Sequence, residues 1–446
     1  MNELQETSAP LGYLARIRGL VRRDFVRSVF VLAFGTLLGN GLSALVSPIL
    51  TRLYAPGDLG RAGVFTAFIN VASTASALRY ELAIVSADTA EDAATLALGS
   101  LVIALPVSIL LGGVLYGLIT MKLFGFEVLP LWAAAVAPLS LFVASSFLTF
   151  RFWLLRDGKF ASVSRIFVGQ NITRAGVQLG SGVGHVGWTG LFLGDLSGRT
   201  LAVAVMAKRG WADLVACARR INRTEFKRVF ALHREFPTVS LPSTLLDMVA
   251  LNLPLPLVAR YFGVDAGGQF ALVQMVFALP ASLIGGSIGD AFHSKAAELA
   301  RTDRDQVRPF FLRTTRLLFL LGVGPFLFLA LVGPTLVRLV FGARWETAGI
   351  LAAVMTPWAL GQLVVSPVSR IVFIVQGQRV KLLNDAFNLS IVAASFFVAS
   401  HLHLSLIRTL GVLTAAQCVM YIVYFLLLLR TISKFTARAA AAGPIV

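Results

Sequence analysis

Long apolar stretches alternate with short polar or charged segments along most of the chain. The stretch from Leu317 to Val340 is nearly all apolar, and its residues do not alternate between apolar and polar. A bilayer core is about 30 Å thick and needs about 20 mostly apolar residues for a spanning helix, whereas a barrel strand alternates over about 10 residues. The pattern therefore predicts membrane-spanning α-helices.

We expect twelve such helices and hence an all-α integral membrane protein. Within lipid, helices satisfy their own backbone hydrogen bonds, so a bundle of them is a stable arrangement. The expected spans are residues 28–50, 62–84, 94–119, 129–150, 161–184, 187–207, 238–259, 269–291, 317–340, 348–374, 384–405 and 408–430.

Composition excludes an ordinary soluble protein. The 446 residues are 57% hydrophobic and only 14% charged, with a mean hydropathy of +0.80, whereas soluble domains contain about a quarter charged residues. Cys217 and Cys418 lie far apart and indicate neither a disulfide framework nor a metal site. We expect no metal and no organic cofactor. The polar, basic start of the chain lacks the pattern of a cleaved signal, so the first apolar stretch is expected to be a retained helix.

Basic residues fall mainly on one side of the expected membrane. The chain has 39 Lys and Arg against 22 Asp and Glu, a formal net charge of +17. With the N-terminus in the cytoplasm, 29 of the basic residues fall in cytoplasmic segments and 7 in outer loops. Because Lys and Arg collect in cytoplasmic loops, we expect both termini there. The loop between the second and third spans is an exception, since its charges are all acidic. No soluble basic module is present, so nucleic acid is not an expected partner.

The spans divide the chain into two halves. We expect a basic cytoplasmic segment at 1–27, a six-helix lobe at 28–207, a basic cytoplasmic linker at 208–237, a second six-helix lobe at 238–430 and a cytoplasmic tail at 431–446. The linker has two interpretations. It is a plain connection whose charge sets the topology, or it is an amphipathic helix on anionic headgroups.

The two halves also resemble each other in sequence. A shift of 208 residues superimposes four features at the outer end of the first helix of each half: Pro48 on Pro256, Arg52 on Arg260, Tyr54 on Phe262 and Gly60 on Gly268. Parallel repeats of this kind occur in secondary transporters, with the substrate site between the repeats. The alternative is that both halves use the same helix-ending turn without duplication. We expect an internal repeat.

Four short motifs carry a family resemblance. They occur in order and read TRLYAPGDLG at Thr51–Gly60, LRYELAI at Leu78–Ile84, LLRDGKF at Leu154–Phe160 and FGARWETA at Phe341–Ala348. Together they resemble the polysaccharide-biosynthesis flippases, of the O-antigen type, of the multidrug/oligosaccharidyl-lipid/polysaccharide exporter superfamily. The resemblance extends from about residue 30 to residue 430.

The resemblance implies two lobes that rock around a central cavity by alternating access. It also implies a cargo: an oligosaccharide on undecaprenyl diphosphate, moved from the cytoplasmic to the periplasmic leaflet for lipopolysaccharide or exopolysaccharide synthesis. The expected location is the bacterial inner membrane. Membrane lipids, a polysaccharide polymerase and a chain-length regulator are the further partners that the family implies.

Arginines inside expected spans are the first candidates for contact with a diphosphate. Arg79, Arg174 and Arg199 all fall within spans, where ionisable residues are costly and mark functional sites by default. A guanidinium gives two charge-assisted hydrogen bonds to a phosphate. The alternatives are that Arg199 only neutralises Asp195, four residues earlier, and that Arg79 snorkels or pairs with Glu81.

Two carboxylates are candidates for ion coupling. Asp247 lies in a stretch broken by prolines whose freed carbonyls can help to bind an ion, and Asp195 lies in the sixth span. Sodium and a proton are both open as the coupling ion, and a helix-packing role for Asp247 is an equal alternative. Arg52 and Arg260 are expected to anchor helix ends at the membrane interface.

Other function classes are less consistent with the sequence. No Gly-rich nucleotide loop with a following Lys is present, so we do not expect ATP hydrolysis. A membrane polymerase or ligase would be expected to carry a large outer loop, and every expected outer loop is short. We therefore expect a transporter rather than an enzyme. The remaining alternative is a cation-coupled exporter of drugs or small molecules from the same superfamily.

Overall fold

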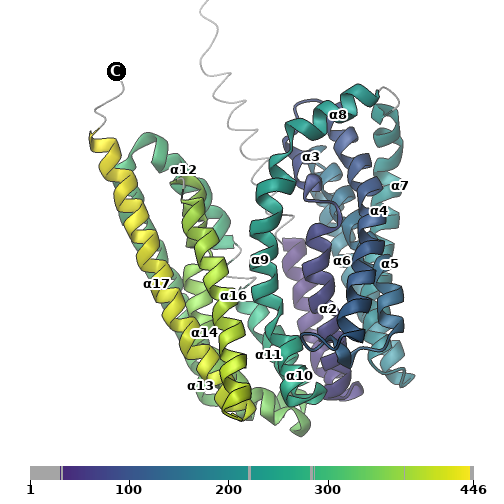
Figure 1. Ribbon diagram of the computed structural model, residues 1–446, viewed down its shortest axis with the longest axis vertical. Coiled ribbons are helices and arrows are strands. Elements are labelled where there is room, and N and C mark those ends of the chain that lie inside the picture. The colour runs from purple at the N-terminus through teal and green to yellow at the C-terminus, as the bar shows by residue number, and fades with distance from the viewer. Residues whose placement is uncertain are drawn as a thin grey trace, which may run out of the picture.

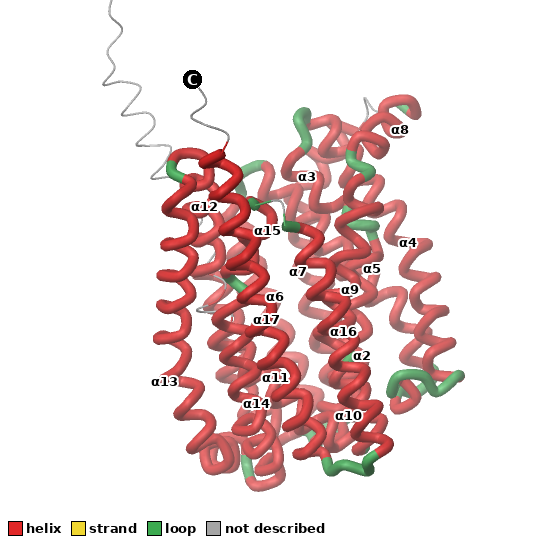
Figure 2. Tube along the Cα trace, turned by 60° about the vertical axis from the view of Figure 1, so that its left-hand side comes forward, coloured by secondary structure: helices red, strands yellow, loops and turns green. Residues whose placement is uncertain are grey.

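The computed structural model describes residues 31, 34–218, 222–281, 285, 287–375 and 377–441, and these residues form helices without any β-strand. Figure 2 shows the helices joined by short loops. Nine helices in the described part are long and apolar enough to cross a membrane. The predicted all-α integral membrane fold is confirmed.

The N-terminal lobe comes first in the chain. Its helices are Phe34–Leu53 (the first helix, in its described part), α2 (Pro56–Ser76), η1 (Tyr80–Leu82), α3 (Ala83–Ser86), α4 (Ala90–Thr120), η2 (Phe126–Val128), α5 (Trp132–Arg156), α6 (Phe160–Val183) and α7 (Trp188–Ala218). The helix α8 (Arg223–Leu232) then connects this lobe to the next.

The C-terminal lobe repeats the arrangement with more interruptions. It contains the π-helical turn η3 (Phe236–Ser240), α9 (Leu241–Asn252), α10 (Pro254–Phe262), α11 (Val264–Pro280), α12 (Ser287–Thr302), η5 (Arg304–Gln306), α13 (Val307–Phe341), η6 (Ala343–Trp345), α14 (Glu346–Val365), η7 (Val368–Arg370), α15 (Ile371–Ile374), α16 (Gln378–His401) and α17 (Leu406–Ala441).

Each of the twelve expected spans corresponds to one helix, or to consecutive helices, in the described residues. Several expected boundaries are wrong. Helix α2 begins at Pro56 instead of 62, because proline suits a first helical turn and Asp58 accepts a hydrogen bond from the Ala55 amide at 3.1 Å. It ends at Ser76 instead of 84, because Leu78 and Arg79 have positive φ angles.

Two further boundaries differ by larger amounts. Helix α12 (Ser287–Thr302) continues beyond the end expected at 291, and residues 282–284 and 286, between α11 and α12, lie outside the described residues. Helix α7 continues to Ala218, beyond the expected end at 207, and the helix α8 lies inside the range 208–237 expected as a linker.

The two lobes meet where α2 crosses α11. A Cβ atom added to Gly60 would clash with the carbonyl oxygen of Val264, and one added to Gly268 would clash with that of Pro56. The offset of 208 residues that relates Gly60 to Gly268 also relates Pro56 to Val264. The same close contact is therefore made twice, once from each half, as an internal repeat requires.

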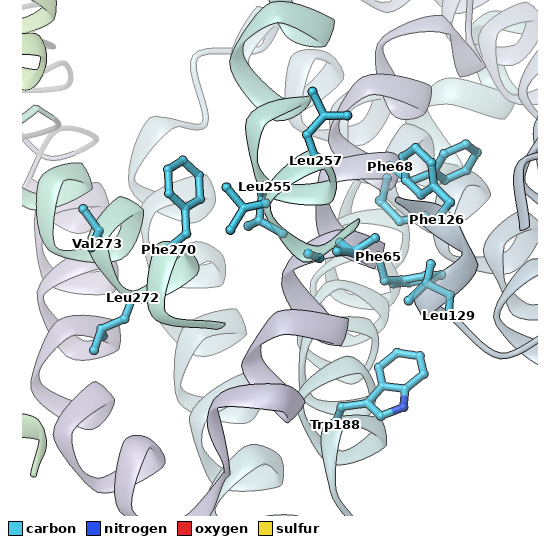
Figure 3. Close-up of a cluster of buried hydrophobic side chains, with 14 of the residues drawn as sticks. Phe65, Phe68, Phe126, Leu129, Trp188, Leu255, Leu257, Phe270, Leu272 and Val273 are labelled. Atoms are coloured by element: carbon cyan, nitrogen blue, oxygen red, sulfur yellow. The ribbon is translucent and has the colours of Figure 1, made fainter. Parts of the chain in front are cut away.

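Apolar side chains from both lobes form one core around this crossing. Figure 3 shows Phe65 and Phe68 of α2, together with Phe126, on one side and Leu255 and Phe270 of the C-terminal lobe on the other. Phe270 is completely buried and Leu255 is 4% exposed. Burying apolar area stabilises the contact between the lobes at this end of the molecule.

Two loop contacts reinforce the same end, again one from each half. The Nε1 of Trp345, in η6, donates a hydrogen bond to the Thr51 carbonyl oxygen at 2.9 Å. Gly125, beside η2, has a φ of 93° and lies so close to Pro256 that a Cβ would clash with its carbonyl oxygen. Arg260 adds an ion pair with Glu127 at 3.1 Å. Each lobe thus places a loop on the first helix of the other.

At the opposite end the lobes diverge. In Figure 1, α12 and α17 stand apart from α3 and α8 at the end where the C-terminus lies, whereas α10, α11 and α2 lie together at the other end. The contacts between the lobes around Thr51, Gly60 and Gly125 all belong to the joined end. The lobes are therefore joined at one end and separated at the other, and the charge pattern of the sequence predicts that the separated end faces the cytoplasm.

The connecting helix α8 packs on the N-terminal lobe. Arg228 pairs with Asp92, at the start of α4, at 2.7 Å, and the Asp92 side chain is only 8% exposed. The Phe230 ring packs against Tyr80 in a tilted arrangement, with ring centroids 4.5 Å apart, and lies directly over Gly99. The acidic loop between the second and third expected spans therefore contains a carboxylate, Asp92, whose positive partner comes from α8.

We predict that Gly60→Ala destabilises the protein, because the new methyl group has no space against the Val264 carbonyl. Overpacking of this kind costs about 1–3 kcal/mol, so the melting temperature in detergent is expected to fall. Gly113→Ala is the matched control, since Gly113 in α4 has open space around it. Equal melting temperatures for the two variants would contradict the close crossing.

Candidate functional site

A cavity lies in the N-terminal lobe where it faces α11. It has a volume of about 300 Å³ and is lined by the first helix, α2, α6, α7 and the start of α10 in addition to α11. A second cavity of about 490 Å³ shares Ser43, Arg174, Asp195, Arg199 and Met275 with the first. Because these five residues line both cavities, we treat the two cavities as one space and call it the interlobe cavity.

Two arginines in the interlobe cavity share one carboxylate. Arg199 Nε lies 3.1 Å from Asp195 Oδ2, and Arg174 Nη1 lies 3.6 Å from Asp195 Oδ1. The three side chains are between 23% and 40% exposed. One negative charge against two positive charges leaves a net positive charge on this wall. A guanidinium is always protonated and has donors left over for an anionic ligand.

Amide and hydroxyl groups share the rest of the cavity lining with apolar side chains. Asn171 is 6% exposed and accepts a hydrogen bond from the Ser43 hydroxyl at 3.2 Å. Gln178 is 5% exposed and donates to the Leu191 carbonyl at 3.1 Å. Asn70 of α2 donates to Asn252 of α9 at 3.2 Å, which joins the two lobes at the cavity. Groups of this kind can replace water around sugar hydroxyls.

Helix α6 supplies much of this polar lining through its periodicity. Gln170, Asn171, Arg174 and Gln178 follow one another at spacings of one to four residues and therefore lie on one side of the helix. The opposite side carries Ile172, which is 57% exposed and faces outward. In the described part of the chain, α2 and α6 are not among the nine most apolar long helices. Their polarity is accounted for by the cavity that they line.

Glycines bring α7 close enough to α6 for these contacts. A Cβ at Gly194 would clash with the Gln178 side chain, and one at Gly198 would lie 2.7 Å from the Gln170 carbonyl oxygen. Small residues let membrane helices approach each other closely. Asp195 and Arg199 are each the next residue after one of these glycines, so the close approach places both beside Arg174.

The other predicted arginines lie elsewhere. Arg79 lines neither cavity described above; it sits in the turn before η1 with a φ of 68°, and its Nε has no hydrogen-bond partner among the described residues. Arg260 lies at the end of α10 and pairs with Glu127 across the lobes. Arg52, in the last turn of the first helix, is exposed. The roles predicted for these three residues stay predictions.

The two predicted coupling carboxylates have different surroundings. Asp195 contacts two guanidinium groups, which makes it a counter-ion in this arrangement. Asp247 of α9 lies 3.8 Å from the ammonium of Lys381, which also lies 2.7 Å from Asp385. Within the described residues, no group of three or more His, Cys, Asp or Glu side chains is placed to hold a metal ion.

Basic side chains also mark the surface next to the cavity-lining helices. Lys159, just before α6, pairs with Asp157 at 3.1 Å and with Asp213 at 3.2 Å. The hydrogen bond to Asp157 is the main cause that raises the pKa of Lys159 above its ordinary value. Arg156 donates to the carbonyl oxygens of Ile84 and Thr89 at 3.1 and 3.0 Å, which holds the loop before α4.

Several groups at these sites were not predicted from the sequence. Asn171, Gln178 and the Asn70–Asn252 pair were not among the candidates, and Lys381 falls in the loop expected between the spans 348–374 and 384–405. The spacing of polar residues on α6 is a signal that would have identified Asn171 and Gln178. Lys381 stands four residues before Asp385, which is the spacing of a helical ion pair.

The fold is that of the MOP-superfamily transporters. An inward-facing multidrug-resistance transporter of the MATE family and MOP superfamily is 16% identical, with 89% of this chain and 96% of that chain covered and a TM-score of 0.69. An outward-facing MATE-family transporter is 15% identical, with coverage of 92% and 96% and a TM-score of 0.57.

A third similar structure is a MOP-superfamily transporter from Pyrococcus furiosus, described as having a binding pocket of reverse polarity that suggests a different function. Its sequence is 15% identical to this one. The match covers 92% of this chain and 96% of the Pyrococcus chain, with a TM-score of 0.57. At these identities the likeness shows the fold alone.

Family membership comes from the sequence itself. Residues 49–349 match the family described as polysaccharide biosynthesis protein. The match covers more than half of the 446 residues, and the chain therefore belongs to this family of multi-pass membrane proteins. The predicted family is confirmed. No curated protein matches the sequence.

We predict that Asp195→Asn lowers stability and increases the response to anions. Removing the carboxylate leaves Arg174 and Arg199 without their shared counter-ion, at a cost of about 1–3 kcal/mol for a partly buried pair. The melting temperature should fall, and pyrophosphate should raise it by more than in the wild type. Asp88→Asn, at an exposed position in the loop before α4, is the control. An unchanged pyrophosphate response would contradict the assignment of free arginine donors.

Proposed function

We propose that this protein moves a lipid-linked oligosaccharide, carried on undecaprenyl diphosphate, across the bacterial inner membrane by alternating access. The observation that carries the proposal is the pair Arg174 and Arg199 around Asp195, which leaves a net positive charge in the interlobe cavity. A diphosphate that enters a low-dielectric region loses hydration, and paired guanidinium groups can replace it. Family membership supports the same substrate class.

The shape of the cavity supports the direction of transport. The lobes are joined at the crossing of α2 and α11 and diverge at the end that carries α8 and the C-terminus. The charge pattern of the sequence assigns that end to the cytoplasm. In the proposed cycle the diphosphate enters from the cytoplasmic leaflet, the polar side chains of α6 face the sugar, and the joined end opens toward the periplasm.

The proposal extends to energy coupling and to partners. Asp247, next to Lys381, is the carboxylate that we propose to respond to the driving ion, in preference to Asp195, whose oxygens contact arginines. The polymerase and chain-length regulator implied by the family would consume the product on the outer side, which would pull net flux forward. These remain expectations from the family.

A second candidate function is export of cationic drugs by the same fold. The observation that favours it is the Asp195 carboxylate in the cavity, since a carboxylate attracts a cation. The two functions respond oppositely to substitution. Export of a cationic drug should fall with Asp195→Asn and survive Arg174→Ala, whereas transport of a diphosphate lipid should fall with Arg174→Ala.

We predict that Arg174→Ala weakens binding of a polyprenyl diphosphate lipid to the purified protein by about 10- to 100-fold, the value of one or two charge-assisted hydrogen bonds. The same variant should fail to restore polymer in a flippase-deficient bacterium that makes the cognate repeat unit. Arg174→Lys should retain part of the affinity, because it keeps the charge but not the bidentate geometry.

Arg165→Ala is the matched control. Arg165 lies on the same helix, is exposed, and contacts the Ala161 carbonyl oxygen at 3.3 Å instead of the interlobe cavity. Its variant should bind and complement like the wild type. Equal binding by the Arg174 and Arg165 variants would refute the assigned site, and failure of the wild-type protein to complement would refute the flippase function.

A further inference from the structure

The C-terminal lobe contains a charged cluster outside the interlobe cavity. Lys381 and Asp385 stand one turn apart on α16, with Nζ 2.7 Å from Asp385 Oδ2. Asp247 reaches the same ammonium from α9, at 3.8 Å. One helical turn beyond, Gln417 of α17 donates to Asn388 at 2.6 Å. The cluster therefore joins three helices of the lobe.

The charges of this cluster are the inverse of those in the interlobe cavity. The cavity has two cations around one carboxylate, whereas this cluster has two carboxylates around one cation. The Asp385 side chain is only 4% exposed, so its charge requires a partner. Lys381 is 24% exposed and supplies that partner from within the chain.

A metal ion does not fit beside this lysine. An ammonium has three N–H donors and no lone pair, so it cannot be a ligand and it repels a cation. Nζ already lies within hydrogen-bond distance of the buried carboxylate and within ion-pair distance of the other. A sodium ion would have to displace the ammonium from both carboxylates in order to use their oxygens.

We infer that the Lys381 ammonium is a built-in cation that occupies the position between Asp247 and Asp385, so that the C-terminal lobe binds no metal ion there. Asp385 and Lys381 move together because they share α16, whereas Asp247 belongs to α9. The 3.8 Å contact is therefore the one that can break when α9 moves against α16. Helix α9 directly follows the π-helical turn Phe236–Ser240, a type of irregularity that is frequent at functional sites.

The inference rests on the proposed function and deepens it, because it specifies how the coupling carboxylate Asp247 is neutralised and leaves the proton, rather than sodium, as the driving ion at this carboxylate. Its test does not depend on that function. The measurement is the melting temperature of the purified protein without substrate, in sodium chloride and in choline chloride of equal concentration. A ligand that binds only the folded state raises this temperature.

The wild-type protein is expected to melt at the same temperature in both salts. Lys381→Ala vacates the position between the carboxylates, and sodium should then raise the melting temperature by about 2–4 °C relative to choline. Adding Asp385→Asn to Lys381→Ala should abolish that rise. Lys295→Ala is the control, since Lys295 pairs with Glu298 on exposed α12 at 2.6 Å and should show no sodium effect.

Two results would overturn the inference. Sodium-specific stabilisation of the wild-type protein would show that a metal ion binds despite the lysine. This comparison uses only the wild-type protein and is therefore valid even if the variants fold poorly. Absence of any sodium effect in folded Lys381→Ala would show that the lysine does not occupy a cation position. Neither result bears on diphosphate binding at Arg174, so failure here and failure of the proposed function are distinguishable.

Discussion

The close crossing of α2 and α11 is the contact on which the rest of the arrangement depends. Gly60 and Gly268 permit backbone-to-backbone contact there, and any larger residue would separate the lobes. Apolar side chains surround the crossing, and a loop from each lobe rests on the first helix of the other. With one end joined in this way, the lobes separate only at the other end, and polar side chains of α6 and α7 face the space between the lobes.

The crossing also explains the repeated motif. Gly60 and Gly268 match at an offset of 208 residues, and so do the carbonyls that they contact, at Pro56 and Val264. A shared helix-ending turn would account for proline, arginine and glycine in each half. It would not account for each half contacting the other through equivalent atoms. The structure thus favours duplication. When two repeats are related by a two-fold axis, a glycine at the same position of each repeat makes the same contact with the other repeat.

The sequence predicted the twelve helices and the two lobes because lipid requires long apolar helices and the repeat is visible in the residues themselves. Partners within one helix were also predictable: Arg199 with Asp195 follows from a spacing of four. Partners from different helices were not. Arg174 with Asp195, and Lys381 with Asp247, depend on how α6 meets α7 and how α9 meets α16. Arg79 shows the opposite error, since the left-handed turn at Leu78 and Arg79 ends α2 before the residue that appeared to lie within it.

The inverse charges of the two lobes are physically consistent with one anion-binding lobe. Two arginines around one aspartate leave guanidinium donors available, so the anion that we propose as substrate would gain hydrogen bonds in the N-terminal lobe. Two aspartates around one lysine leave a net negative charge, which repels an anion, and the buried Asp385 is already paired. The charge distribution of the C-terminal lobe then changes only when the ion pairs of Lys381 with Asp247 and Asp385 rearrange. Substrate binding and conformational change would therefore be separated between the lobes, with the Asn70–Asn252 hydrogen bond across the cavity as a direct link between them.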